Sequence, residues 1–211
     1  MTEPDWAALD AAWEPARAAG ILGGVTLEDI RQHAAGFVPA ACGVFDGRRL
    51  LGERRGVDLG SGAGVPGVVL ALEHPDSTWL LVDSNERRCS LLHRVVRDLG
   101  LGERVEVLHA RAEDVAHDAD HRAQFDVAVA RLFGPAADVA ECAIPLVNEH
   151  GVVVVSASSD RENWTSVAAR SEFAVVWRDE PTGTFVELTP TMVVPATWPR
   201  RPNARQRTPL F

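Results

Sequence analysis

The sequence predicts an α/β protein built on a doubly wound, mostly parallel, seven-stranded sheet. Short apolar segments alternate with helical ones between residues 55 and 156, as they do in a series of β–α–β units. A glycine-rich turn, GSGAGVPG, follows the first apolar segment directly, which is typical of a strand that leads into a helix through a tight loop. Two later apolar segments, separated by a Pro-Thr-Gly turn, predict an antiparallel hairpin that completes the sheet.

The individual elements follow from apolar periodicity and from the residues that begin and end helices. The first fifty residues form a helical extension, because Trp6, Leu9 and Trp13 recur at helical spacing and Thr26 can cap another helix. We expect strands at 55–59, 78–82, 105–108, 125–130 and 151–156, and hairpin strands at 172–177 and 184–188. Helices are expected at 66–74, from Ser84 or Asn85 to Gly100, and at 135–147.

The chain divides into three predicted parts: a helical extension at 1–50, a central domain at 51–195 and a basic tail at 196–211. The tail contains several prolines and arginines and no acidic residue, so we expect it to be extended on an otherwise acidic protein. Its arginines are Arg200, Arg201, Arg205 and Arg207.

Composition excludes several classes of protein. With 46% hydrophobic and 24% charged residues, the 211-residue chain is globular rather than disordered, and no apolar run reaches membrane-spanning length. The absence of lysine excludes Walker-type phosphate loops and Schiff-base chemistry. A net charge of −9 argues against coating nucleic acid through bulk electrostatics but leaves room for a local basic patch. We expect a monomeric, cytoplasmic protein that makes no contact with membranes.

The glycine loop is the strongest candidate for a binding site. Its glycines satisfy the dinucleotide fingerprint, but Asp58 ends the preceding strand, and a carboxylate there would repel a pyrophosphate. S-adenosylmethionine carries an ammonium group, a sulfonium group and no phosphate, so Asp58 would attract its amino-acid end directly or through water. The loop residues that would approach this part of the donor are Gly60, Ser61, Gly62, Ala63 and Gly64.

Two further acidic positions complete this candidate site. Asp83, at the end of the second strand, can accept hydrogen bonds from both ribose hydroxyls. After the third strand, backbone N–H groups and the carboxylate of Glu113 can recognise adenine, beside Ala112. The alternative is that these acidic residues only cap helices or lie at the surface.

Four segments of the chain resemble the 16S ribosomal RNA guanine-N7 methyltransferases, once called glucose-inhibited division protein B. They are VDLGSGAGVPGVVLAL, LLVDSNERRCSLLHRVVRDLGL, VEVLHARAED and FDVAVARLFGP, and the similarity runs over residues 54–156. The Pro-Arg-Arg-Pro run at 199–202, with the arginines that follow it, is similar to the basic ending of that family.

The resemblance implies a class I, Rossmann-like methyltransferase fold, S-adenosylmethionine as donor, and 16S rRNA or the small ribosomal subunit as partner. By position it implies that Ser84 joins Asp83 at the ribose, that Ala112 and Glu113 flank adenine, and that Arg131 faces the site of methyl transfer. The chain departs from the family pattern in two places. The family's Asn-Leu-Thr segment before the first strand is missing, and Ala157 stands where the family usually has lysine.

The chemistry of the site agrees with this acceptor. Guanine N7 has a free lone pair and loses no proton on methylation, so no general base is required, and positioning supplies most of the rate. The sequence has no tyrosine, its Cys142 lies within a predicted helix, and no Asn/Asp-Pro-Pro-Tyr/Phe turn follows the fourth strand. Arg131 is the candidate catalytic residue, contacting the donor carboxylate or a phosphate, and Phe133 can stack on a flipped base.

A set of arginines forms the expected RNA-binding patch, although a solvated helix face would equally explain those near residue 87. Its members are Arg87, Arg88, Arg200, Arg201, Arg205 and Arg207. His117 and His121 have metal-ligand spacing, but their segment is a polar loop and methyl transfer needs no metal, so we expect none.

Other functions stay open at this point. A small-molecule or protein methyltransferase could use the same donor site, and the acidic charge favours it. A donor-binding protein without catalytic activity is the second alternative, and Ala157 supports that option. A nicotinamide dehydrogenase is disfavoured by Asp58.

Overall fold

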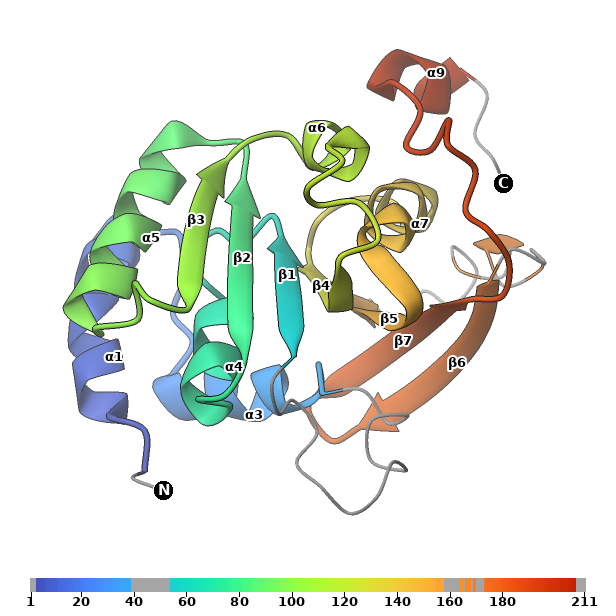
Figure 1. Ribbon diagram of the computed structural model, residues 1–211. Coiled ribbons are helices and arrows are strands. Elements are labelled where there is room, and N and C mark those ends of the chain that lie inside the picture. Colours follow the sequence, from blue (N-terminus) through green and yellow to red (C-terminus); the bar gives the residue numbers. More distant parts are fainter. Residues whose placement is uncertain are drawn as a thin grey trace.

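The computed structural model describes residues 3–38, 54–157, 164, 166, 167, 169 and 173–207. Its centre is a seven-stranded sheet in the order β3-β2-β1-β4-β5-β7-β6 (Figure 1). The first five strands are parallel, and the β6–β7 hairpin joins antiparallel to β5. The predicted α/β sheet with its C-terminal hairpin is therefore confirmed.

The strands lie close to their predicted bounds. They are β1 (Arg55–Leu59), β2 (Thr78–Asp83), β3 (Val105–His109), β4 (Phe125–Arg131), β5 (Val147–Ala157), β6 (Phe173–Glu180) and β7 (Gly183–Pro190). β1 and β2 are buried on both faces from their second residue onward, which explains their continuous apolar sequence. β5 begins earlier than expected, since a short 3₁₀ turn at Ile144–Leu146 replaces the last turn of the predicted helix.

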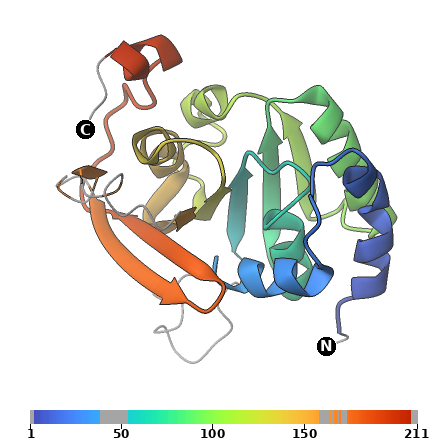
Figure 2. The same cartoon turned by 180° about the vertical axis from the view of Figure 1, so that it is seen from behind.

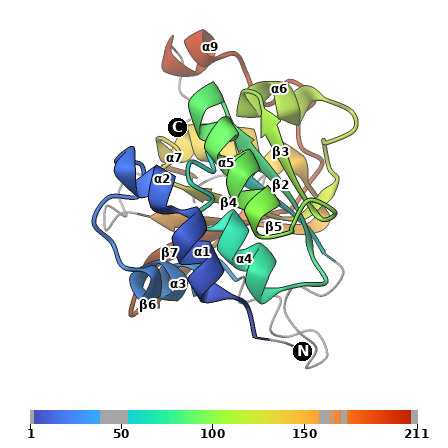
Figure 3. The same cartoon turned by 90° about the vertical axis from the view of Figure 1, so that its left-hand side faces the viewer.

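Helices cover both faces of the sheet. Figure 3 shows α1, α4 and α5 on one face, and α6 and α7 lie on the other. The helices are α1 (Trp6–Ala12), α2 (Glu14–Ala18), α3 (Leu27–Ala35), α4 (Gly67–Glu73), α5 (Glu86–Asp98), α6 (Ala112–His117), α7 (Ala136–Ala143) and α9 (Pro202–Arg207). Asn85 caps α5 through hydrogen bonds from the N–H groups of Arg87 and Arg88, as the sequence predicts.

The N-terminal helices pack into the same core as the glycine loop. Trp13 is fully buried and donates from Nε1 to the carbonyl oxygen of Ala63, 2.7 Å away. Phe37 packs edge-on against Phe185 of the hairpin. Figure 2 shows α3, in light blue, beside the turn of the orange hairpin, where His33 Nδ1 lies 3.1 Å from the carbonyl oxygen of Thr182. The predicted helical content is confirmed for residues 3–38, and the rest of the predicted extension, 39–50, lies outside the described residues.

The expectation of an extended tail is wrong. Residues 195–207, which we call the C-terminal strap, fold back over the helical layer formed by α6 and α7 and end in helix α9 (Figure 1). Trp198 is buried in the same core cluster as residues of α6 and α7, and Arg122 donates to the carbonyl oxygens of Pro195 and Trp198 at 2.9 and 2.7 Å. The apolar side chain of Trp198 packs into this core, a contact that the many arginines of the tail do not suggest.

In the described part of the chain, no helix is both long and apolar enough to cross a bilayer.

Candidate functional site

The glycine loop runs from β1 to α4 at the carboxyl end of the sheet. Gly60, Gly62 and Gly64 have φ angles of +71°, +59° and +93°, a region that favours glycine. The N–H groups of Gly60 and Ser61 donate to the carbonyl oxygen of Val82, so the loop is fixed against β2. A Cβ atom at Gly64 would collide with the side chain of Val68. The loop is therefore held by backbone bonds and admits no larger side chain at that position.

Asp58 lies beneath the loop and is 1% exposed. Its Oδ2 atom accepts a hydrogen bond from the N–H group of Gly67 at 2.9 Å, at the start of α4. This contact agrees with the alternative interpretation, in which the acidic residue caps a helix. Its Oδ1 atom is buried and accepts no hydrogen bond within the described chain. Burial raises the pKa of Asp58 to about 7, against the opposing effects of the Gly67 N–H group and the charge of Arg131.

Arg131 ends β4 and lies near Asp58. Its Nε atom donates to the carbonyl oxygen of Val65 at 3.3 Å, so the side chain reaches back under the glycine loop. Burial lowers the pKa of this guanidinium, and the carboxylate of Asp58 acts in the opposite direction. The structure brings the two residues together, but the side chain of Arg131 does not line the cavity described below.

Asp83 stands at the end of β2 and is 3% exposed. Its Oδ2 atom accepts from the N–H group of Gly62 at 3.0 Å, and its Oδ1 atom accepts from the N–H group of Asn85 at 2.8 Å. Arg88 approaches Oδ2 to within 3.7 Å. Each oxygen keeps accepting capacity, because a carboxylate offers about four lone-pair sites.

A cavity of about 300 Å³ opens between the ends of β1, β2 and β4. It brings Gly60, Asp83, Ser84, Ala112 and Glu113 together, all of them predicted donor residues. It does not include Asp58, Ser61, Gly62, Ala63 or Gly64. The rest of its lining is Val82, Arg88, Ala110, Arg111, Leu132, Phe133, Gly134, Pro135, Asp138 and Arg205.

A larger hollow of about 780 Å³ lies near the amino ends of the strands, around Thr78 and Val105. It is an open surface trough, and it contains none of the predicted site residues. Ligands of open α/β sheets bind outside the carboxyl ends of the strands, so the smaller cavity is the candidate site.

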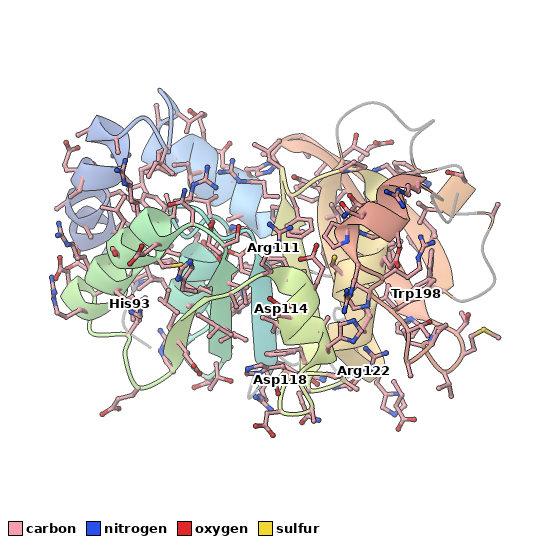
Figure 4. The ribbon with its side chains drawn as sticks, turned by 90° about the horizontal axis from the view of Figure 1, so that it is seen from above. His93, Arg111, Asp114, Asp118, Arg122 and Trp198 are labelled. Atoms are coloured by element: carbon pink, nitrogen blue, oxygen red, sulfur yellow. The ribbon has the colours of Figure 1, made fainter. Side chains whose placement is uncertain are left out.

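Glu113 is a second predicted acidic residue in the lining of this cavity. Its carboxylate pairs with Arg111 at 3.3 Å and with Arg205 of the strap at 2.5 Å. Burial raises the pKa of Glu113, but the hydrogen bonds from these two arginines outweigh burial and lower it. Figure 4 looks down on this edge of the sheet and labels Arg111 at the start of α6.

The predicted RNA-binding arginines fall into two groups. Arg87, Arg88, Arg201 and Arg207 are exposed. Arg200 and Arg205 instead point into the protein, where Arg200 pairs with the buried Glu141 at 2.8 Å and Arg205 is 8% exposed. Their expected role at RNA phosphates is therefore replaced by ion pairs within the chain, because the strap carries both side chains onto acidic residues of α6 and α7.

Several residues that shape the site carry no signal in the sequence. Glu141 and Asp138 of α7 pair with Arg200 and Arg205, and His117 Nε2 lies 2.7 Å from the carbonyl oxygen of Pro199. The expectation of no metal site stays a prediction. No group of three or more His, Cys, Asp or Glu side chains suited to a metal occurs among the residues described.

Comparison with known proteins assigns the chain to a family. A family model described as rRNA small subunit methyltransferase G matches residues 45–176. A protein of Moorella thermoacetica named ribosomal RNA small subunit methyltransferase G is 30% identical over 165 residues, which are 73% of this chain and 68% of that protein. The chain belongs to this family. A second relative of the same name, from Trichormus variabilis, is 36% identical over 67% of this chain and 54% of its own length.

Solved structures agree on the methyltransferase fold of the family. A methyltransferase from Geobacter sulfurreducens superposes with a TM-score of 0.63 at 16% identity, covering 90% of this chain and 92% of that one. An O-methyltransferase from Bacillus cereus gives the same TM-score at 15% identity, covering 88% and 91%. The chain is thus an S-adenosylmethionine-dependent methyltransferase of class I fold.

The residues present fit this donor. Asp58 Oδ1 is a buried acceptor that has no hydrogen-bond partner among the described residues, which suits a cationic amino group. The cavity is lined by three carboxylates, Asp83, Glu113 and Asp138, and by three arginines, Arg88, Arg111 and Arg205. The carboxylate of Asp83, which keeps accepting capacity, can receive the hydroxyl groups of a ribose.

Proposed function

We propose that this chain methylates N7 of a guanine in 16S ribosomal RNA, with S-adenosylmethionine as methyl donor. The observation that carries the proposal is the cavity at the carboxyl ends of β1, β2 and β4, where Asp83 and Glu113 lie within the segment that matches the methyltransferase G family. The protein is a divergent member of that family, because the match begins only at residue 45.

The donor is held in three places. Asp83, with Ser84 beside it, accepts the ribose hydroxyls, and Glu113 and Ala112 receive the adenine. Of the glycine loop, Gly60 lines the cavity. We assign the backbone of Gly60, Ser61, Gly62, Ala63 and Gly64 to the amino-acid end of the donor, with Asp58. Because most of these groups are backbone atoms fixed to neighbouring strands, little reorganisation is needed on binding.

S-adenosylmethionine supplies an electrophilic methyl group on its sulfonium. The chain needs no general base, since guanine N7 offers a free lone pair and loses no proton when it is methylated. The side chains of Phe133 and Leu132 stand at the mouth of the cavity, and a Cβ atom at Gly60 would lie 3.1 Å from Phe133 Cδ2. We assign Phe133 to stacking on the acceptor base, a contact worth about 1–3 kcal/mol.

Arg131 is the proposed catalytic residue. Its guanidinium is tied to the carbonyl oxygen of Val65 and lies near Asp58, so it reaches the side of the loop that bounds the amino-acid end of the donor. From there it would hold the donor carboxylate while Asp58 receives the ammonium group. An arginine can do so with two parallel hydrogen bonds, which fixes direction as well as distance.

The RNA would contact the exposed arginines at the same edge of the sheet. Arg87 and Arg88 lie in the first turn of α5, Arg201 directly precedes the strap helix α9, and Arg207 is its last residue. These four supply a local positive surface that the net charge of −9 conceals. The enzyme acts on the small ribosomal subunit or its RNA as a cytoplasmic monomer, and light scattering would test its oligomeric state.

The decisive experiment supplies methyl-labelled donor to the purified protein together with small ribosomal subunits or deproteinised rRNA from cells that lack the gene. We expect label in 7-methylguanosine after digestion. Asp83→Ala should abolish this label, whereas Arg17→Gln, which changes an ion pair between α2 and Asp10 of α1, should not. No label in either RNA sample, with donor binding intact, would contradict the RNA proposal.

A small-molecule or protein methyltransferase is the competing function. The ion pairs of Arg200 and Arg205 within the chain favour it, because they take two positive charges away from the proposed RNA surface. The salt dependence of acceptor binding separates the two functions, since only an RNA acceptor gives a steep fall in affinity with rising salt.

A further inference from the structure

Arg205 connects the C-terminal strap to the donor cavity. Although it stands 92 residues after Glu113, its Nη2 atom lies 2.5 Å from Glu113 Oε1. Its Nε atom lies 2.9 Å from Asp138 Oδ1 on α7, and its Nη1 atom donates to the carbonyl oxygen of Arg200 at 3.0 Å. A residue that the sequence places in a solvated tail is thus buried between α6 and α7.

The side chain of Arg205 is also part of the cavity wall. It lines the same space of about 300 Å³ as Asp83, Glu113 and Asp138. The strap is therefore a component of the donor site, and it faces the end of the cavity where Glu113 lies.

Arg205 controls the orientation of Glu113 more strongly than Arg111 does. The side chain of Arg111 is 59% exposed and its two contacts with Glu113 are both 3.3 Å long, so solvent screens this pair. The side chain of Arg205 is only 8% exposed and makes the shorter contact. A buried, charge-assisted hydrogen bond of this kind fixes both partners in one geometry.

The strap has anchors besides Arg205. Arg122 donates to the carbonyl oxygens of Pro195 and Trp198, and His117 Nε2 lies 2.7 Å from the carbonyl oxygen of Pro199. Figure 4 labels Arg122 and Trp198. Arg200 pairs with Glu141. A change at Arg205 therefore leaves most of the docking contacts in place.

We infer that Arg205 is a positioning residue for the methyl donor: it holds the Glu113 carboxylate in the orientation that receives adenine. The inference rests on the donor site proposed above. It assigns the C-terminal strap a part in donor binding, separate from any contact that its exposed arginines make with RNA.

The test measures the Kd for S-adenosylhomocysteine by calorimetry, with no RNA present, on proteins whose melting curves show that they are folded. We expect Arg205→Gln to raise Kd about tenfold and Arg205→Lys to restore part of the loss, since lysine keeps the charge but not the planar fork. Asn203→Ala is the matched control, an exposed change on the same helix that should leave Kd unchanged.

A double-mutant cycle separates positioning from general stability. If Arg205 acts through Glu113, Arg205→Gln should add almost nothing to the Kd of a Glu113→Gln protein. A further tenfold rise in Kd in that background would overturn the inference. A Kd that Glu113→Gln raises but that Arg205→Gln leaves unchanged would also overturn it. An unchanged Kd for Glu113→Gln would instead refute the assignment of Glu113 to adenine, and the inference with it.

Discussion

The two ends of the candidate site hold their carboxylates by different means. On the glycine-loop side, Asp58 and Asp83 accept hydrogen bonds from backbone N–H groups of nearby residues, Gly67, Gly62 and Asn85. On the strap side, Glu113 and Glu141 are held by guanidinium groups from residues 92 and 59 positions away in the sequence. The first arrangement depends on loop shape, and the second depends on tertiary docking.

This difference has consequences for tolerance to substitution. A backbone N–H group cannot be removed by a side-chain change, so the loop side keeps its geometry in most variants. On the strap side a single arginine substitution removes a charged partner from a buried carboxylate, which is costly. The loop side is therefore the rigid part of the site, and the strap side is the part that substitutions can uncouple.

The largest effect should come from removing a carboxylate on the rigid side. Asp83→Ala deletes the acceptor for both ribose hydroxyls and should weaken S-adenosylhomocysteine binding about 100-fold, roughly 3 kcal/mol for two charge-assisted hydrogen bonds. Calorimetry provides the measurement. A loss of less than threefold would show that Asp83 serves only the loop, through Gly62.

The next effect breaks the strap side. Arg200→Gln removes the guanidinium from Glu141, whose side chain is only 1% exposed, and should lower the free energy of unfolding by about 2–3 kcal/mol. The backbone N–H group of Arg200 still donates to Glu141, which limits the loss. Urea unfolding measures it, with the exposed Arg201→Gln as control. Equal stability of the two variants would contradict the idea that the strap is anchored by this pair.

A pH experiment tests the loop side. The pKa of Asp58 is raised in the folded protein to about 7, so the native state binds more protons than the unfolded state between about pH 4 and pH 7. Its contribution to stability is therefore fully present below pH 4 and is lost as pH rises through 7. Asp58→Asn should flatten this decline, whose slope for one proton is at most about 1.4 kcal/mol per pH unit. The expectation is wrong if the free energies of unfolding of the two proteins, measured in urea, change with pH in the same way across this window.

The smallest effect distinguishes exposed arginines on the strap from buried ones. Arg207→Gln should leave donor affinity unchanged, weaken binding of small-subunit RNA about threefold and reduce its salt slope by about one. Filter binding at several salt concentrations provides the measurement. If Arg207→Gln altered S-adenosylhomocysteine binding, the distinction between buried strap arginines that support the donor and exposed ones that contact RNA would be wrong.

The sequence predicts the parts of the fold and site that depend on local contacts, and it does not predict those that depend on contacts between distant residues. The strands, the glycine loop, Asp83 and the Asn85 cap are predictable because each depends on residues close by in the chain. The partners of Arg200 and Arg205 are not, because nothing in a run of prolines and arginines indicates which acidic residues it will meet. Trp198, the one large apolar residue among them, was the available signal that this segment packs against the core.

The separation between Arg205 and Glu113 also determines how the site forms during folding. Contacts between residues so far apart require closure of a large loop, so they form after the local β–α–β contacts. The strap should accordingly be the last part to dock and the first to open, and its amide hydrogens should exchange faster than those of β1 and β2. A bound donor would slow that exchange selectively, so the protein's own cofactor would complete the closure of the strap.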